Sequence, residues 1–200
     1  NVAIGSNALL AMNTGNYNTV MGHNAADALV GGTHNVIIGD HAGSTTTDVD
    51  ACVIIGQSAC ESGNMTSAAD GTVAIGKGAL VDLTSGAGNV AVGYQAGDAI
   101  TSAGQNTAIG TGALGTLVDG DQNTAIGYNA MASGTHTSYN FNTVVGANAG
   151  DSFTSVGIEY VTVLGANAVG GALTAAANGA VAVGESALAA LTSGSGNTAI

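Results

Sequence analysis

The apolar residues of this chain gather in short triplets, and a glycine follows each triplet directly. These rung glycines, as we call them, recur at nearly constant intervals of seventeen to twenty residues and are Gly5, Gly22, Gly39, Gly56, Gly76, Gly93, Gly110, Gly127, Gly146, Gly165 and Gly184. An amphipathic helix would instead repeat apolar residues three and four apart over ten or more positions. A triplet of aliphatic or β-branched residues before a glycine predicts a short strand that ends at a sharp bend.

The repeat extends over the entire chain. Its units, which we call rungs, begin near residues 1, 18, 35, 52, 72, 89, 106, 123, 142, 161, 180 and 197. Because no linker separates them, we expect 1–200 to form a single repeat domain. We expect an all-β fold, a parallel β-solenoid of about 12 rungs in which each rung contacts only its neighbours. The chain starts and stops inside the same motif, so we expect it to be a segment of a longer fibre.

Two further columns describe the inside of a rung. Alanine is the third residue after all eleven rung glycines, which predicts a cramped interior just past the bend. A looser apolar column lies seven residues after the rung glycine, at Met12, Leu29, Leu83, Ile100, Leu117, Phe153 and Leu191, and it fails at Thr46, Gly63 and Gly134. The remaining residues are typical of turns, and the longer rungs gain their extra residues there, as at 133–141. We expect these insertions to be exposed loops.

Asparagine is the first residue of eight rungs. These residues are Asn1, Asn18, Asn35, Asn89, Asn106, Asn123, Asn142 and Asn197. Stacked asparagine side chains can hydrogen-bond to one another along a solenoid, so we interpret the column as a structural ladder rather than as a glycan or ligand site.

Both faces of the predicted strand are apolar. The residues one and three before the rung glycine share one face, which we assign to the interior of the coil, and the residue two before it lies on the other face. That residue is Ala, Val or Ile in every rung, although a face in contact with water would carry polar residues. We therefore expect copies of the chain to cover this second face, which includes Ala108 and Val144, and its small residues favour a parallel homotrimer around a threefold axis. A lipid-binding or ice-binding face is the alternative.

These residues carry a family resemblance. The segment Asn106–Leu114, Asn-Thr-Ala-Ile-Gly-Thr-Gly-Ala-Leu, resembles the head repeat of YadA-like trimeric autotransporter adhesins, and similar repeats occur in bacteriophage tail fibres. The resemblance covers all the rungs and implies a left-handed β-roll of three parallel chains, located outside the cell and binding through its outer surface. The rungs of this chain are longer than the usual adhesin repeat. The sequence shows neither a coiled-coil stalk nor a membrane anchor, so adhesin and tail fibre both stay open.

Charge excludes several classes of partner. One lysine and no arginine stand against 13 acidic residues, which gives a net charge of −12. Such a chain repels the phosphates of nucleic acids and offers no basic patch to an anionic membrane. We expect the partners to be further copies of the chain and a receptor or glycan on a host surface.

The two cysteines are candidates for a disulfide. Cys52 and Cys60 lie four residues before and four residues after Gly56. If the chain doubles back at this glycine, the two side chains face each other across one rung, as a disulfide requires. The alternative is a pair of small buried thiols.

No metal or calcium site is predicted. The histidines are His23, His34, His41 and His136. His23 and His41 lie one and two places after their rung glycines in adjacent rungs, so we expect them to point in different directions on the surface. The pairs Asp48 with Asp50 and Asp119 with Asp121 are interpreted as solvated loop acids, because the repeated motif of calcium-binding β-rolls is absent.

Catalysis and cofactor binding are not expected. Sugar cleavage needs two carboxylates on either side of one bond, and Glu61, Glu159 and Glu185 fall in widely separated rungs. We therefore assign no catalytic, cofactor or metal residues and expect a structural or adhesive fibre segment. The alternatives are the shaft of a phage fibre or spike for host recognition and, less favoured, a solenoid polysaccharide hydrolase.

Overall fold

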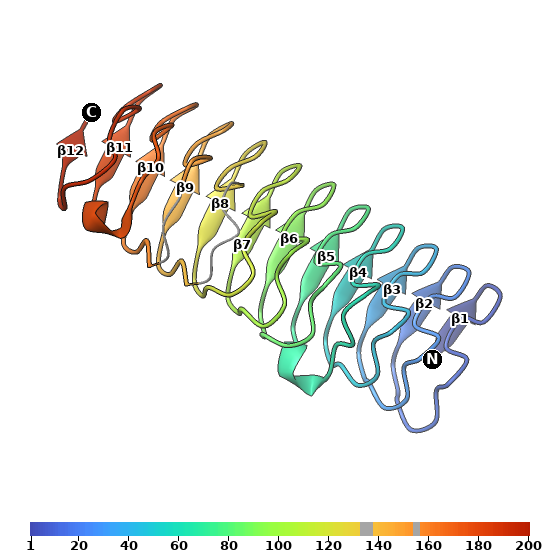
Figure 1. Ribbon diagram of the computed structural model, residues 1–200. Helices are drawn as coiled ribbons and strands as arrows, with labels where there is room; N and C mark the ends of the chain where they lie inside the picture. Colours follow the sequence, from blue (N-terminus) through green and yellow to red (C-terminus); the bar gives the residue numbers. More distant parts are fainter. Residues whose placement is uncertain (133–137, 154–156) are drawn as a thin grey trace.

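The computed structural model describes residues 1–132, 138–153 and 157–200, which wind into an elongated parallel β-solenoid of about 11 turns (Figure 1). Each turn contributes one short strand to a single parallel sheet, in which the strands follow chain order. The strands are β1 (Val2–Ile4), β2 (Thr19–Met21), β3 (Val36–Ile38), β4 (Val53–Ile55), β5 (Val73–Ile75), β6 (Val90–Val92), β7 (Thr107–Ile109), β8 (Thr124–Ile126), β9 (Thr143–Val145), β10 (Thr162–Leu164), β11 (Val181–Val183) and β12 (Thr198–Ala199). Two single 3-10 turns, η1 (Ser67–Ala69) and η2 (Ala175–Ala177), are the only helical segments among the described residues. The predicted solenoid is confirmed.

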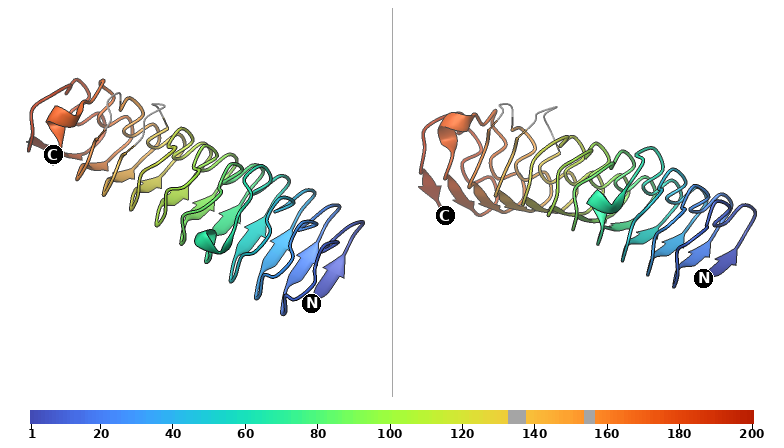
Figure 2. Two further views of the ribbon diagram at one scale, coloured as in Figure 1. Left: turned by 60° about the horizontal axis from the view of Figure 1, so that its bottom comes forward. Right: turned by 90° about the horizontal axis from the view of Figure 1, so that it is seen from below.

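Equivalent positions of successive rungs stack directly on one another. Strand β3 pairs with β4 so that Val36 lies beside Val53 and Ile37 beside Ile54, and the other strand pairs repeat this register. Figure 2 shows the strands along one side of the rod from end to end, with the two termini at opposite ends. The columns seen in the sequence are therefore columns in space.

The rung glycines let neighbouring rungs approach closely. Their φ angles lie between +119° and +148°, a region that side chains exclude. A Cβ added to Gly110 would lie 2.3 Å from the carbonyl oxygen of Gly127 in the next rung. Glycine is therefore required here for two independent reasons, its backbone angle and the contact with the next rung.

The asparagine ladder is confirmed. Asn35 Nδ2 donates to Asn18 Oδ1 at 2.9 Å and to the carbonyl oxygen of Val49 at 2.6 Å. Asn106, Asn123 and Asn142 repeat the contact farther along the rod. These side chains are buried, so the ladder satisfies polar groups that would otherwise destabilise the interior.

The interior is filled by residues of complementary size. The residue two before the rung glycine lies opposite the fourth residue after it. In several rungs a large residue at one position accompanies a small one at the other, as for Ile37 with Gly43 and Ala108 with Leu114. The alanine column is buried from Ala25 to Ala168, as predicted. Large and small residues thus alternate across a thin core, which keeps it closely packed.

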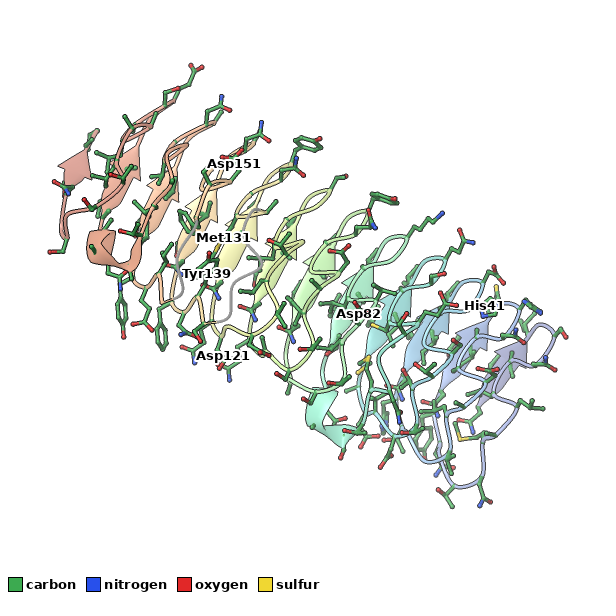
Figure 3. The ribbon with its side chains drawn as sticks, viewed as in Figure 1. His41, Asp82, Asp121, Met131, Tyr139 and Asp151 are labelled. Carbon is green, nitrogen blue, oxygen red and sulfur yellow. The ribbon has the colours of Figure 1, made fainter. Side chains whose placement is uncertain are left out.

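The expectation of fully exposed insertions was wrong. In two of the longer rungs, where the looser apolar column fails, a residue near the insertion is buried instead. These residues are Met65 and Tyr139, and Figure 3 labels Tyr139. The Tyr139 ring packs edge-on against Phe153, with ring centroids 5.8 Å apart. The predicted loop residues 133–137, with Gly134 and His136 among them, lie outside the described residues.

Replacement of a rung glycine tests the close approach of the rungs. We expect Gly110→Ala to lower the free energy of unfolding by more than about 3 kcal/mol, because it combines a forbidden backbone angle with a clash against backbone. The matched control is Gly71→Ala, where φ is +72° and an added Cβ would meet no atom within 4 Å. That change should cost only about 1–2 kcal/mol in urea unfolding. Equal losses in the two variants would contradict the account.

Candidate functional site

The orientation of the strands differs from the prediction. In strands β2 to β11 the middle residue is buried inside the coil, while the first and third residues point outward and are partly exposed. Ala108 and Val144 are 1% and 0% exposed within the single chain, so the face assigned to the contact between copies is the core. The assignment was wrong because it took the larger residues for the core, whereas the thin interior already holds the alanine column.

The outward residues form a continuous uncharged surface of aliphatic and threonine side chains, which we call the outer strip. It consists of the first and third residues of β1 to β11: Val2, Ile4, Thr19, Met21, Val36, Ile38, Val53, Ile55, Val73, Ile75, Val90, Val92, Thr107, Ile109, Thr124, Ile126, Thr143, Val145, Thr162, Leu164, Val181 and Val183. Met21, Ile109 and Leu164 are 44%, 38% and 38% exposed, values high for large aliphatic side chains. No charged residue interrupts the strip.

The strip is large enough to bind a partner. Strand spacing and rise give it a length of about 50 Å and a width of about 10 Å, hence an area of roughly 500 Å². The largest contiguous apolar patch of a soluble monomer is typically about 300–600 Å² and is often functional, so the strip is a candidate for an interaction site. The described residues contain no helix that is long and apolar enough to cross a membrane.

The two cysteines are buried as free thiols. Burial raises the pKa of Cys52 to about 11, and burial, followed by the charge of Cys52, raises the pKa of Cys60 still further. Thiols with such a pKa contain little of the reactive thiolate at neutral pH. The disulfide between them stays a prediction.

The predicted loop acids bridge neighbouring rungs. Asp50 Oδ1 accepts from the backbone N–H and the hydroxyl of Thr33, at 2.6 and 2.8 Å. Asp121 Oδ1 accepts from the backbone N–H of Gly104 at 2.7 Å, and Asp119 accepts from the hydroxyl of Ser102 (Figure 3). These carboxylates therefore contribute to stacking.

The glutamates are not assembled into one site in the described part of the chain. Glu159 Oε1 accepts from Asn140 Nδ2 at 3.2 Å, Glu61 lies 3.5 Å from His41 Nδ1, and Glu185 is exposed beside the last complete strand. The three carboxylates have different surroundings on different rungs.

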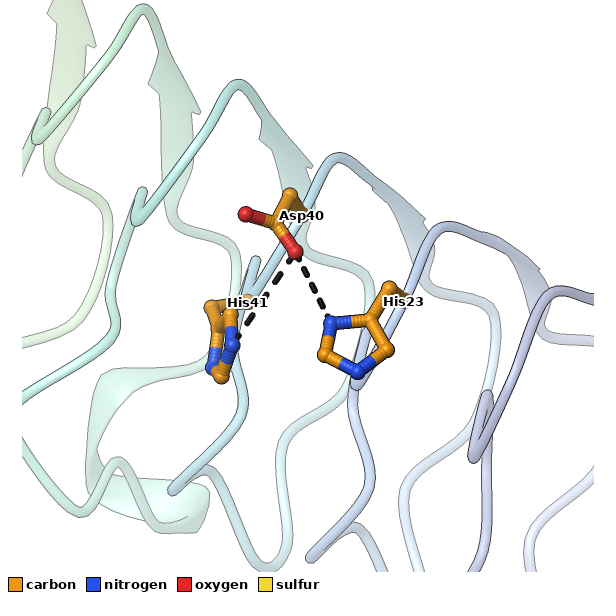
Figure 4. A group of neighbouring side chains, drawn as sticks. All are labelled: His23, Asp40 and His41. Carbon is orange, nitrogen blue, oxygen red and sulfur yellow. Dashed lines mark hydrogen bonds and ion pairs between the residues drawn. The ribbon is translucent and has the colours of Figure 1, made fainter.

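The histidine prediction was wrong for one pair. His23 and His41 do not diverge: their ring centroids are 5.3 Å apart, and both rings face Asp40 (Figure 4). His34 lies elsewhere and stacks on Tyr17, with ring centroids 5.0 Å apart. The signal that could have revealed the cluster is the direct stacking of rungs, which places residues after successive rung glycines side by side.

Sequence reasoning also missed Asp98. Partial burial, and then the charge of Asp82, raise the pKa of the Asp98 carboxyl above its usual value. The two acids lie on adjacent rungs, where backbone bonding between residues 82 and 98 holds the segments together. Asp98 is therefore harder to ionise in the folded chain than in the unfolded one.

No family model, curated protein or solved structure matches the chain. The resemblance to adhesin head repeats accordingly stays a prediction from the repeat itself.

The raised pKa of Asp98 predicts a pH-dependent effect of Asp98→Asn. Because the folded-state pKa is above the unfolded one, Asp98 stabilises the fold at low pH, and this contribution is lost as the pH rises through the folded pKa. We expect Asp98→Asn to raise Tm by about 1–2 °C at pH 7, after allowance for solvent screening, and to leave it unchanged at pH 3.

Asp48→Asn is the control, because it removes the same charge from an exposed position. A Tm increase of equal size in both variants, or at both pH values, would show that overall charge rather than the surroundings of Asp98 is responsible.

Proposed function

We propose that the chain is a segment of an extracellular homotrimeric fibre, with a structural and adhesive role. The outer strip is the observation that carries the proposal, because a single chain leaves these aliphatic side chains in contact with water. Full burial of one such side chain contributes about 1.5–3 kcal/mol, and the strip contains eleven third-position residues that are Ile, Val, Leu or Met. Association along the strip offsets the entropy lost on assembly.

The residues of the strip favour parallel copies. The first strand residue is Val in β3 to β6 and Thr in β7 to β10. Parallel chains in register place Val against Val and Thr against Thr, and opposed Thr hydroxyls can then hydrogen-bond to one another. In an antiparallel pair over the twelve strands, every Val layer would face a Thr layer and leave hydroxyls against methyl groups.

Three chains suit a strip only two side chains wide. Around a threefold axis, each rung contributes one layer of converging side chains from three strands, and closed symmetry limits growth to a rod. The resemblance to trimeric adhesin heads supports this number and supports a left-handed coil. The small residues that first favoured a threefold axis no longer support it, because they fill the interior of each coil.

The remaining surface suits a fibre that spaces or presents binding sites. The acidic residues lie outside the strip, so their mutual repulsion disfavours lateral aggregation between rods. A ladder of backbone hydrogen bonds runs through all the turns and makes the rod stiff. Variable loops would then contact a host surface or glycan, in an adhesin or in a phage fibre alike, with no catalytic step.

Charged substitutions in the strip test the assembly. We expect the parent protein to sediment with three times the mass of the 19.0 kDa chain. The double variant Ile109→Glu and Ile126→Glu should dissociate to single chains, because six buried carboxylates would face one another around the axis. The matched control is Tyr94→Glu with Tyr128→Glu, which changes exposed side chains at two bends separated by one rung and should stay trimeric.

Circular dichroism would verify that both variants keep the β-solenoid. A parent protein of 19.0 kDa would contradict association altogether. A parent with twice the mass of one chain, which the strip variant converts to single chains, would keep the interface but exclude the threefold axis.

A further inference from the structure

The bends of the second and third rungs depart from the repeat. The first residue after the rung glycine is His23 in one rung and Asp40 in the next, and the second residue is Asn24 followed by His41. Elsewhere the second position holds only Asn, Ser, Gly or Gln, residues that suit its positive φ or turn geometry. Two histidines and an aspartate on adjacent stacked bends thus form a local exception within a regular fibre.

The three side chains converge on one point of the surface (Figure 4). Asp40 Oδ1 lies 3.0 Å from His23 Nδ1 and 3.9 Å from His41 Nε2, and all three atoms fall within 4.8 Å of one another. Two ligands of a tetrahedral Zn²⁺ ion, each about 2.0–2.1 Å from the metal, are roughly 3.3–3.4 Å apart. Small rotations of exposed side chains therefore suffice to bring all three atoms to coordination distance.

The neighbours of His41 determine which of its ring nitrogens carries hydrogen. Glu61 Oε1 lies 3.5 Å from His41 Nδ1, and the negative carboxylate favours hydrogen on that nitrogen. Asn24 Oδ1 accepts from Asn7 Nδ2, so the Asn24 Nδ2 group faces His41 Nε2, 3.4 Å away. Both neighbours favour the tautomer with hydrogen on Nδ1 and none on Nε2. A carboxylate on the distal nitrogen of a ligand histidine is a common feature of protein metal sites.

We propose that His23, Asp40 and His41 bind a divalent transition metal ion of the zinc type. Two imidazoles and a carboxylate are the donor set that such ions prefer over calcium or magnesium. A net charge of −12, with Lys77 as the only lysine, favours any divalent cation at the surface. The ion ties the bends of two adjacent rungs together and keeps open coordination positions for a ligand from another molecule.

Calorimetric titration of the intact protein with ZnCl₂ at pH 7.5 tests the site. We expect one Zn²⁺ per chain, and a loss of affinity of at least about 10-fold in His23→Gln and in Asp40→Asn. His34→Gln is the matched control, because it removes an imidazole that lies in the same rung as His23 but stacks on Tyr17, away from the cluster. Its affinity for Zn²⁺ should equal that of the parent. Co²⁺ should give tetrahedral absorption bands in the parent and the control, and not in His23→Gln.

Three results would overturn the proposal. The first is that the parent, at about 1 μM, gives no heat of binding when ZnCl₂ is added to 100-fold excess. The second is that His23→Gln binds Zn²⁺ as tightly as the parent. The third is that Asp40→Asn binds Zn²⁺ as tightly as the parent. Stoichiometry is counted per chain, so the test is independent of whether the chains associate as trimers.

Discussion

The narrow interior of the coil determines which side chains are buried and which are exposed on the surface. Each turn encloses a core one side chain deep, in which the alanine column and the residue two before the rung glycine already fill the space. The interior takes only the middle residue of each strand, so the Ile, Val, Leu and Met at the third position point outward together with the first residue. Direct stacking, permitted by the rung glycines, then joins these residues into the outer strip. The proposed assembly follows from this packing constraint, because a thin core takes one residue of each strand and leaves the other two without a partner inside the chain.

Much of the fold could be predicted from the sequence, because the spacing of the repeat gives the positions of the strands and bends. The period located every strand and bend, and the asparagine column predicted a ladder that Asn35 and Asn106 form. The direction of the strand faces could not be predicted in the same way, because alternation distinguishes two faces without saying which is inside. The rule that larger residues form the core failed at Ile109 and Leu164, and the space beside the alanine column decided the outcome.

The chemistry of the surface was harder to predict, because it depends on contacts between rungs rather than within one. His23 and His41 belong to adjacent rungs and occupy different places in the repeat, yet stacking brings their rings together. Asp98 is one acid among 13 acidic residues in the sequence, and its raised pKa arises from burial and from Asp82 on the adjacent rung. In a regular solenoid, departures from the consensus at stacked positions are therefore the places where particular functions can arise.

Solvent accessibility at the outer strip measures the central claim most directly. A nitroxide at residue 124 can be compared with one at the exposed residue 111. Both are placed in a background of Cys52→Thr and Cys60→Ala, residues that other rungs hold in the same columns at Thr72 and Ala26. If copies of the chain cover the strip, the label at 124 is protected from a soluble relaxation agent and broadened by the labels of the other chains, while the label at 111 stays accessible. Equal accessibility at the two positions, without broadening, would contradict the claim.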